Sequence, residues 1–216
     1  CRCALWLTRV FLGINVKVTG AEHIPERPCV ILANHQSTWE TFFLSAYFQP
    51  LSQVLKRELL YVPFFGWAMA MLRPIAIDRD NPKAALKHIA KKGDELLKDN
   101  IWVLIFPEGT TTDGLGLRTF HGRLLSSAID SGVPLQPVAI RYLRDGQPCP
   151  IAPWVGDDGM LDHLLRMLSS DIAEVEIRLL SPLSSQDSSR NQLARQAQEA
   201  IARALYDDLQ DLRQSA

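Results

Sequence analysis

The chain has 216 residues, 47% of them hydrophobic and 22% charged, which excludes wholesale disorder and allows one domain with a sizeable core. Its net charge is −1, but residues 1–144 carry 17 Lys and Arg against 12 Asp and Glu, whereas residues 145–216 carry 6 against 12. The basic excess of the first part favours an anionic ligand or a membrane surface, and it is equally expected of ordinary solvated faces.

Strand-like and helix-like segments alternate along the chain. Apolar runs rich in β-branched residues and bounded by turn residues predict strands near residues 14–19, 29–33, 74–78, 101–106, 134–142 and 173–180. Apolar residues at helical spacing predict helices over residues 3–12, 38–48, 82–98, 121–131, 159–168 and 190–213. The alternation predicts a single α/β domain with a mixed, mostly parallel central sheet, flanked by helices and ending in an amphipathic helix.

Two apolar stretches fit either a membrane interface or the protein interior. Residues 3–16 are interrupted by Arg9, and residues 59–72 carry no charge but contain Pro63 and Gly66. The chain has no run of 18 apolar residues, so the sequence predicts no full transmembrane helix. For residues 59–72 we favour burial.

The four cysteines, at positions 1, 3, 29 and 149, predict neither a metal site nor a disulfide framework. Cys1 and Cys3 have no companion Cys/His pair at metal-ligand spacing. The absence of a disulfide framework fits a reducing compartment.

A histidine and a carboxylate follow the strand predicted at 29–33. His35 falls in the loop after this strand, and Glu40 falls in the first turn of the next helix. A carboxylate that accepts a hydrogen bond from one imidazole nitrogen raises the basicity of the other, as a general base requires. The same spacing also results when a helix N-terminus simply attracts an acidic residue to its dipole, so the pair alone does not decide.

A second carboxylate follows the strand predicted at 101–106. Glu108 lies between Pro107 and Gly109. This placement predicts that Glu108 and the neighbouring backbone amides bind the polar head of a substrate, with a plain strand-terminating turn as the alternative.

Basic residues supply candidate anion ligands. Arg79 ends the strand predicted at 74–78 and is the main candidate for a phosphate, because a guanidinium binds phosphate in bidentate fashion. Lys56 precedes the second apolar stretch, and Arg118, His121 and Arg123 follow Glu108 closely enough to add to one pocket.

Other chemistries lack their signatures. The chain has no G-x-S-x-G elbow, P-loop or G-x-G-x-x-G fingerprint, and its basic residues lack the interleaved aromatics of a nucleic-acid surface. His23, His88 and His163 have no spaced partners, and we interpret them as structural.

Four blocks, taken in order, resemble the motifs of the glycerolipid acyltransferase family, in particular the bacterial 1-acylglycerol-3-phosphate (lysophosphatidic acid) acyltransferases. The resemblance extends from about Asn15 to Arg144. The family motifs and their matches are N-H-x4-D (Asn34, His35 and Glu40), a strand ending in Arg (Ile75 to Arg79) after a Lys-x-Glu-Leu block (Lys56 to Leu59), F-P-E-G-T-R-S (Phe106 to Thr110) and V-P-x-x-P-V (Val133 to Val138).

The resemblance implies an O-acyltransferase in which His35 takes the proton from the free hydroxyl of a lysophospholipid while Glu40 orients the imidazole. The alkoxide would attack the thioester of acyl-CoA or acyl-carrier protein, without a metal or another cofactor. With 1-acylglycerol 3-phosphate as the acceptor, the product would be phosphatidic acid. The acceptor would be positioned by Arg118 and by residues of the other motifs, namely Lys56, Arg79, Glu108, Gly109 and Thr110.

The family also implies a place at the cytoplasmic face of the bacterial inner membrane, with membrane lipids and the acyl donor as partners and no nucleic acid. Because the chain begins with Cys1 rather than Met, we expect upstream residues to be missing. Residues 1–13 would then be the remnant of an N-terminal membrane anchor, and residues 14–216 the acyltransferase domain. A lipid-modified Cys1 is the alternative.

Two departures from the motifs leave alternatives open. Glu40 is one methylene longer than the usual Asp, which permits a non-catalytic lipid-binding protein of the same fold. Thr111 stands where Arg is expected. Unless Arg118 or Arg123 replaces this anion contact, the acceptor could be a lipid without a phosphate, such as lyso-ornithine lipid. A thioesterase, which transfers the acyl group to water, is a further alternative that the basic residues disfavour.

Overall fold

The computed structural model describes residues 14–63, 65–78, 80–154, 159, 162–163, 165–166, 174–186 and 188–214, with the side chains of the last helix described as far as residue 207. The predicted helix 3–12 and Arg79 therefore lie outside the described residues, as does most of the predicted helix 159–168.

The strands form one mixed sheet of eight. Their bounds are β1 Asn15–Thr19, β2 Val30–Ala33, β3 Leu51–Lys56, β4 Ile75–Ile77, β5 Trp102–Ile105, β6 Leu135–Arg144, β7 Gln147–Pro148 and β8 Glu174–Leu179. The order is β1-β8-β6-β2-β5-β3-β4, and β7 pairs with β6. Every pairing is parallel except those of β6 with β7 and β8. This confirms the predicted mixed, mostly parallel sheet.

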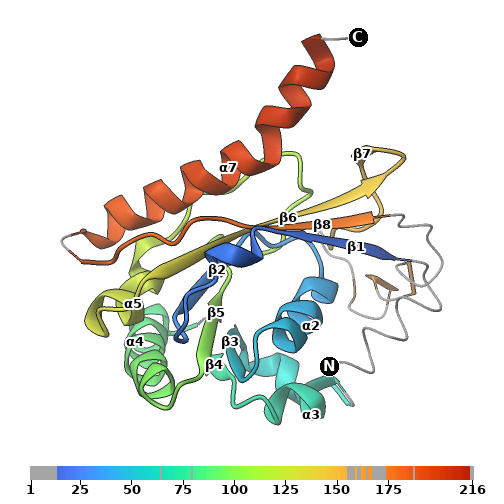
Figure 1. Cartoon of the computed structure of the whole chain (residues 1–216). Helices are drawn as coiled ribbons and strands as arrows, with labels where there is room; N and C mark the ends of the chain where they lie inside the picture. The colour runs from blue at the N-terminus through green and yellow to red at the C-terminus, as the bar shows by residue number, and fades with distance from the viewer. Residues whose placement is uncertain are drawn as a thin grey trace.

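Helices cover both faces of the sheet (Figure 1). The α-helices are α2 Thr38–Tyr47, α3 Phe65–Ala70, α4 Pro82–Lys98, α5 Ser126–Asp130 and α7 Arg190–Gln214. The 3-10 helices are η1 Ala21–His23, η2 Arg57–Tyr61 and η3 Gly122–Leu125. Apolar residues of α2 pack on one face of the sheet, and those of α4, η3, α5 and α7 pack on the other.

The two cores follow from the pleat of the central strands. In β2, Ile31 and Ala33 are buried in the cluster that includes α2, whereas Val30 and Leu32 are buried in the cluster that includes α4 and α7. Successive side chains of a strand point to opposite faces, so a strand covered on both faces is apolar at every position. This explains why β2 and β5 are continuous apolar runs in the sequence.

Most predicted elements that lie within the described residues are confirmed within one or two residues, and two predictions need correction. The sequence analysis missed β3, the η2–α3 pair and the short β7, and the helix predicted at 121–131 is divided into η3 and α5. The largest error concerns residues 59–72. Gly66 and Met69 are buried, but Tyr61, Trp67 and Met71 are among the most exposed large apolar side chains described. Among the described residues, no helix is both long and apolar enough to span a membrane.

Candidate active site

The carboxyl ends of neighbouring parallel strands bring the two polar motifs together. β2 lies between β6 and β5 and pairs in parallel with both. The loops that follow β2 and β5 therefore leave the same edge of the sheet, where ligands of open α/β sheets bind. The loops meet directly, since the backbone N–H of His35 donates to Glu108 Oε1 at 3.0 Å.

Glu40 holds the imidazole of His35 from the first turn of α2. The Nδ1 atom of His35 lies 2.9 Å from Glu40 Oε1. The same oxygen accepts from the backbone N–H groups of Gln36 at 2.7 Å and Ser37 at 2.8 Å. Ser37 is the N-cap of α2 and forms a capping box with Glu40. The motif S-x-x-E thus caps the helix and orients the histidine with one carboxylate.

A tyrosine on β6 completes the surroundings of this carboxylate. The Tyr142 hydroxyl donates a hydrogen bond to Glu40 Oε2, and both residues are fully buried or nearly so. Burial, followed by the charge of Glu40, raises the pKa of Tyr142 well above its usual range, so the phenol remains a donor. A buried carboxylate requires such donors to offset its desolvation. The sequence analysis missed Tyr142, because its partner Glu40 is distant in the sequence.

The loop after β5 fixes the backbone of His35 on both sides. Glu108 accepts from His35 N through Oε1 and from Arg118 N through Oε2, at 2.8 Å for the latter. The N–H of Thr112 donates to the carbonyl oxygen of His35 at 2.8 Å. Burial raises the pKa of the Glu108 carboxyl, and the two backbone donors oppose this shift. Glu108 is 3% exposed, so in this structure its side chain joins two loops.

Asn34 ties the same loop to β6. Its side-chain oxygen accepts from the N–H of Ile140 at 2.8 Å, and its side-chain nitrogen donates to the carbonyl of Ile140 at 2.9 Å. The amide therefore continues the parallel pairing of β2 with β6 one residue beyond Ala33. An asparagine can do this because its side chain has both a donor and an acceptor.

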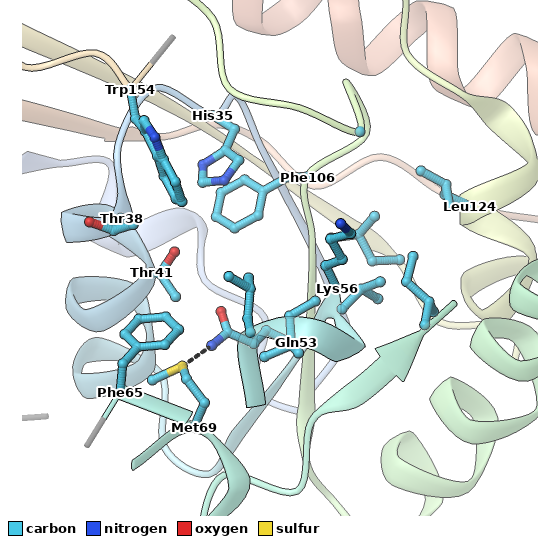
Figure 2. A pocket seen from close by; sticks show the side chains of 16 residues that line it. His35, Thr38, Thr41, Gln53, Lys56, Phe65, Met69, Phe106, Leu124 and Trp154 are labelled. Atoms are coloured by element: carbon cyan, nitrogen blue, oxygen red, sulfur yellow. Dashed lines mark hydrogen bonds between the residues drawn. The ribbon is translucent and has the colours of Figure 1, made fainter. Parts of the chain in front are cut away.

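The ring of His35 faces a cavity of about 160 Å³ (Figure 2). The ring stacks on Phe106, with 3.9 Å between the centroids, and its side chain is 19% exposed. The cavity wall is mostly apolar and includes Leu59, Phe65, Met69, Ile105 and Trp154, with Thr38, Thr41, Gln53 and Lys56 as polar members. Because Nδ1 is held by Glu40, Nε2 is the nitrogen that remains for a ligand in this cavity.

A second, larger cavity of about 590 Å³ adjoins the first and shares Ile77, Gly109 and Leu124 with it. Its other lining residues are Pro82, Ala85, Leu86, Ile89, Phe120, His121, Gly122, Arg123 and Asn191. Gly109 has a φ of 71°, a left-handed conformation that favours glycine, and it stands where the two cavities meet.

The predicted acceptor-binding residues have different positions. Lys56 and Gly109 line the cavity beside His35, whereas Thr110 is half-buried and outside both sets of lining residues. Arg118 contributes its backbone N–H to Glu108. Arg79 lies outside the described residues.

Thr111, where the family motif has Arg, donates a hydrogen bond to the carbonyl of Trp154. The N–H of Trp154 in turn donates to the carbonyl of Gln36 at 2.7 Å. These two hydrogen bonds hold Trp154 in the wall of the cavity, beside His35 (Figure 2). Nothing in the sequence pattern pointed to Trp154, because it lies far from every motif in the chain.

Comparison with known proteins supplies an independent test of the motif assignment. A family model described as Acyltransferase matches residues 15–141, more than half of the chain. A 1-acyl-sn-glycerol-3-phosphate acyltransferase from Pseudomonas aeruginosa is 58% identical over 165 residues, which is 76% of this chain and 63% of that protein. A lyso-ornithine lipid O-acyltransferase from the same organism is 42% identical over 201 residues, 93% of this chain and 77% of that protein.

The fold has a counterpart among solved structures. It is similar to the crystal structure of the 1-acyl-sn-glycerophosphate (LPA) acyltransferase PlsC from Thermotoga maritima, with a TM-score of 0.69, 22% identity, and coverage of 97% of this chain and 80% of that one. The chain spans a little less than two thirds of the first Pseudomonas relative, at 63%. The matched motifs lie within the range of the family model, and the chain belongs to the acyltransferase family.

Proposed function

We propose that the protein transfers a fatty acyl group from acyl-CoA or acyl-carrier protein to the free hydroxyl of a lysophospholipid. The observation that carries the proposal is the hydrogen bond between His35 Nδ1 and Glu40, which leaves Nε2 available at an apolar cavity. The names of the relatives support the same reaction class.

His35 acts as the general base in this mechanism. Its Nε2 takes the proton of the acceptor hydroxyl as the oxygen attacks the thioester carbonyl. Glu40 stabilises the imidazolium that forms, because its carboxylate accepts from Nδ1 at 2.9 Å. Collapse of the tetrahedral intermediate breaks the carbon–sulfur bond, and the imidazolium proton passes to the departing thiolate. No metal or other cofactor takes part.

Two acceptors are supported by specific observations. We favour 1-acylglycerol 3-phosphate, in agreement with the relative that is 58% identical. Lys56 at the cavity and Arg79, carried over from the family motif, would bind its phosphate. The second candidate is lyso-ornithine lipid, because Thr111 bonds to Trp154 where the motif has an arginine, and because the relative that is 42% identical carries that name.

The acyl donor and the lipid acceptor also suggest a location. We propose that the protein works at the cytoplasmic face of the membrane, where acyl-CoA and acyl-carrier protein are present.

A panel of lysolipid acceptors, assayed with one labelled acyl-CoA, tests the proposal. We expect diacyl product with lysophosphatidic acid, and none when His35→Ala is assayed. His88→Ala, which changes an exposed histidine on α4, is the matched control and keeps full turnover. Release of free fatty acid without an acceptor would indicate a thioesterase instead. Lipid binding without any product would indicate a non-catalytic protein.

The same panel identifies the acceptor. Arg79→Ala should raise the KM for lysophosphatidic acid about tenfold or more, with a smaller effect on kcat, if this arginine binds the phosphate. An unchanged KM would remove Arg79 from the phosphate site. Turnover with lyso-ornithine lipid and none with lysophosphatidic acid would refute our choice of acceptor.

A further inference from the structure

The helix α3 has an apolar sequence, and part of its surface is exposed. Its sequence, Phe-Gly-Trp-Ala-Met-Ala, contains no polar side chain. Phe65 and Met69, four residues apart, share the inward face and line the cavity that His35 faces. Phe65 packs edge-on against Phe42 of α2, and Gln53 Nε2 lies 2.8 Å from the sulfur of Met69.

The opposite face of α3 is exposed. Trp67 is 63% exposed and Met71 85%, and the N–H of Met71 donates to the carbonyl of Trp67, so the two residues lie about one helical turn apart. Tyr61, at the end of η2, is 77% exposed. We call Tyr61, Trp67 and Met71 the α3 face. A soluble helix of this composition is normally buried, so a second covering surface is expected.

The α3 face belongs to a closely packed unit. A Cβ atom on Gly66 would lie 2.2 Å from the carbonyl oxygen of Leu60, so only a glycine lets α3 approach η2 this closely. The N–H of Gly66 also donates to the carbonyl of Val62 at 2.7 Å. The close contact between η2 and α3 therefore fixes the position of α3, on which Trp67 is exposed.

Basic residues flank the α3 face. Residues 59–72 contain no charged side chain. Lys56, Arg57 and Glu58 precede them, with Lys56 paired to Glu58 at 3.7 Å, and Arg73 follows them. Arg57 is exposed and has no ion-pair partner within the described part of the chain. Arg73 pairs with Asp99 at 3.1 Å, but both side chains are more than half exposed, and a pair of this kind is weak. An apolar centre between basic flanks, with Trp and Tyr at the boundary, is complementary to an anionic bilayer surface.

We propose that the α3 face docks in the interfacial layer of an anionic lipid bilayer and that the acceptor reaches His35 past the inward face of the same helix. This inference rests on the proposed function for its acceptor. Leu59 of η2, with Phe65 and Met69 of α3, also lines the cavity that His35 faces. Figure 2 shows Phe65 and Met69 at the end of the cavity away from Trp154. A lipid whose acyl chain remains in the bilayer would thus place its headgroup beside the base.

Vesicle flotation tests the docking face. With phosphatidylcholine vesicles containing phosphatidylglycerol, Trp67→Ser/Met71→Ser should lower the partition coefficient about tenfold or more, because two apolar side chains no longer enter the interface. Leu115→Ser changes a side chain that is 72% exposed on another loop, and it should bind as the wild type does. An undiminished partition of the double variant, or an equal loss with Leu115→Ser, would overturn the proposal.

A second test changes a basic residue beside the α3 face and leaves the three apolar side chains in place. Arg57→Gln should weaken binding to anionic vesicles about fivefold, and the difference should shrink with added salt. Lys87→Gln, an exposed charge on α4, is the matched control and should have no effect. If the double variant instead loses self-association or binding to acyl-carrier protein while vesicle binding persists, the α3 face contacts a protein and the proposal fails.

The acceptor route is separated from the chemistry by a soluble acceptor. With a short-chain lysolipid below its micelle concentration, the double variant should keep wild-type turnover, whereas turnover on vesicle-borne acceptor should fall in step with binding. Full turnover on both acceptors would refute the route. Flotation requires no catalysis, so vesicle binding without acyl transfer by the wild type would refute only the proposed function.

Discussion

At the scale of single residues, Glu40 combines two requirements that usually fall on different side chains. One of its oxygens accepts from His35 Nδ1 and from the amides of Gln36 and Ser37, and the other accepts from Tyr142. The sequence analysis treated attraction of Glu40 to the helix N-terminus and its contact with His35 as alternatives. In the structure the same carboxylate caps α2 and lies 2.9 Å from His35 Nδ1. The longer side chain of Glu, where the family motif has Asp, suits the reach from the third helical position back to the N-cap.

Glu40→Gln separates charge from geometry. The amide oxygen can still accept from His35 and the two backbone N–H groups, and the amide nitrogen can donate to a Tyr142 hydroxyl that reverses its role. We expect kcat to fall roughly a hundredfold or more with little change in KM, because the imidazolium loses its negative partner. Steady-state kinetics and a thermal melt measure the two effects. Near-normal kcat in the folded variant would exclude Glu40 as the orienting charge.

Tyr142→Phe tests the partner that the sequence did not reveal. Without the hydroxyl, the buried Glu40 Oε2 loses a donor, which should cost about 1–3 kcal/mol of stability. His35 keeps its contact with Oε1, so kcat should fall far less than in Glu40→Gln. Urea unfolding and kinetics on the same preparation check this order. A larger kcat loss than in Glu40→Gln would contradict it.

At the scale of elements, the site depends on where β2 ends and α2 begins. The apolar run of β2 and the S-x-x-E cap of α2 are both visible in the sequence, and these elements were predicted nearly to the residue. In contrast, β3 was missed because Ser52 and Gln53 interrupt its apolar pattern. Both are buried, with Ser52 donating to the carbonyl of Arg73 and Gln53 lying against Met69, and these long-range partners are not encoded locally.

Ser37→Ala should weaken the element that delivers Glu40. The Ser37 hydroxyl accepts from the N–H of Trp39 and lies 3.1 Å from His163 Nε2, and removing it should cost about 1 kcal/mol or more. Its backbone N–H still donates to Glu40, so we expect a modest fall in kcat. Ser189→Ala removes a comparable exposed contact to Gln192 at the start of α7, and it should lower stability without changing kcat. Equal kcat values in both variants would show that the cap does not position the base.

At the scale of the whole molecule, the fold class followed from the alternation of elements, but the order of the strands did not. Placing β8 between β1 and β6 requires the antiparallel pairing of β6 with β8, which joins segments about 35 residues apart, as in the pair Arg141 and Glu176. The cavities were equally beyond the sequence, because their walls come from elements on both sides of β5. What the motifs could indicate was the edge of the sheet at which those walls meet.

An ion cluster on β6 and β8 fastens α7 to this sheet. Glu176 Oε2 accepts from Arg141 at 2.5 Å and from Arg178 at 3.2 Å. The two guanidinium groups also donate to the carbonyls of Leu205 and Ala204 in α7. Burial alone would raise the pKa of Glu176, but the hydrogen bonds and charges of Arg141 and Arg178 lower it below its ordinary value.

The sign of that shift fixes how Glu176→Gln should behave with pH. A carboxyl whose pKa is lowered on folding stabilises the native state above its unfolded pKa, and this contribution disappears as the pH falls through the folded pKa. The variant should therefore be less stable than the wild type by about 1–3 kcal/mol near neutral pH. The difference should shrink once the pH falls below the ordinary glutamate value. Urea unfolding at a series of pH values measures this difference in stability. The control is Glu199→Gln, which removes one partner of an exposed ion pair on α7 and should change stability little. A difference that is constant with pH would mean that Glu176 contributes through packing and not through its charge.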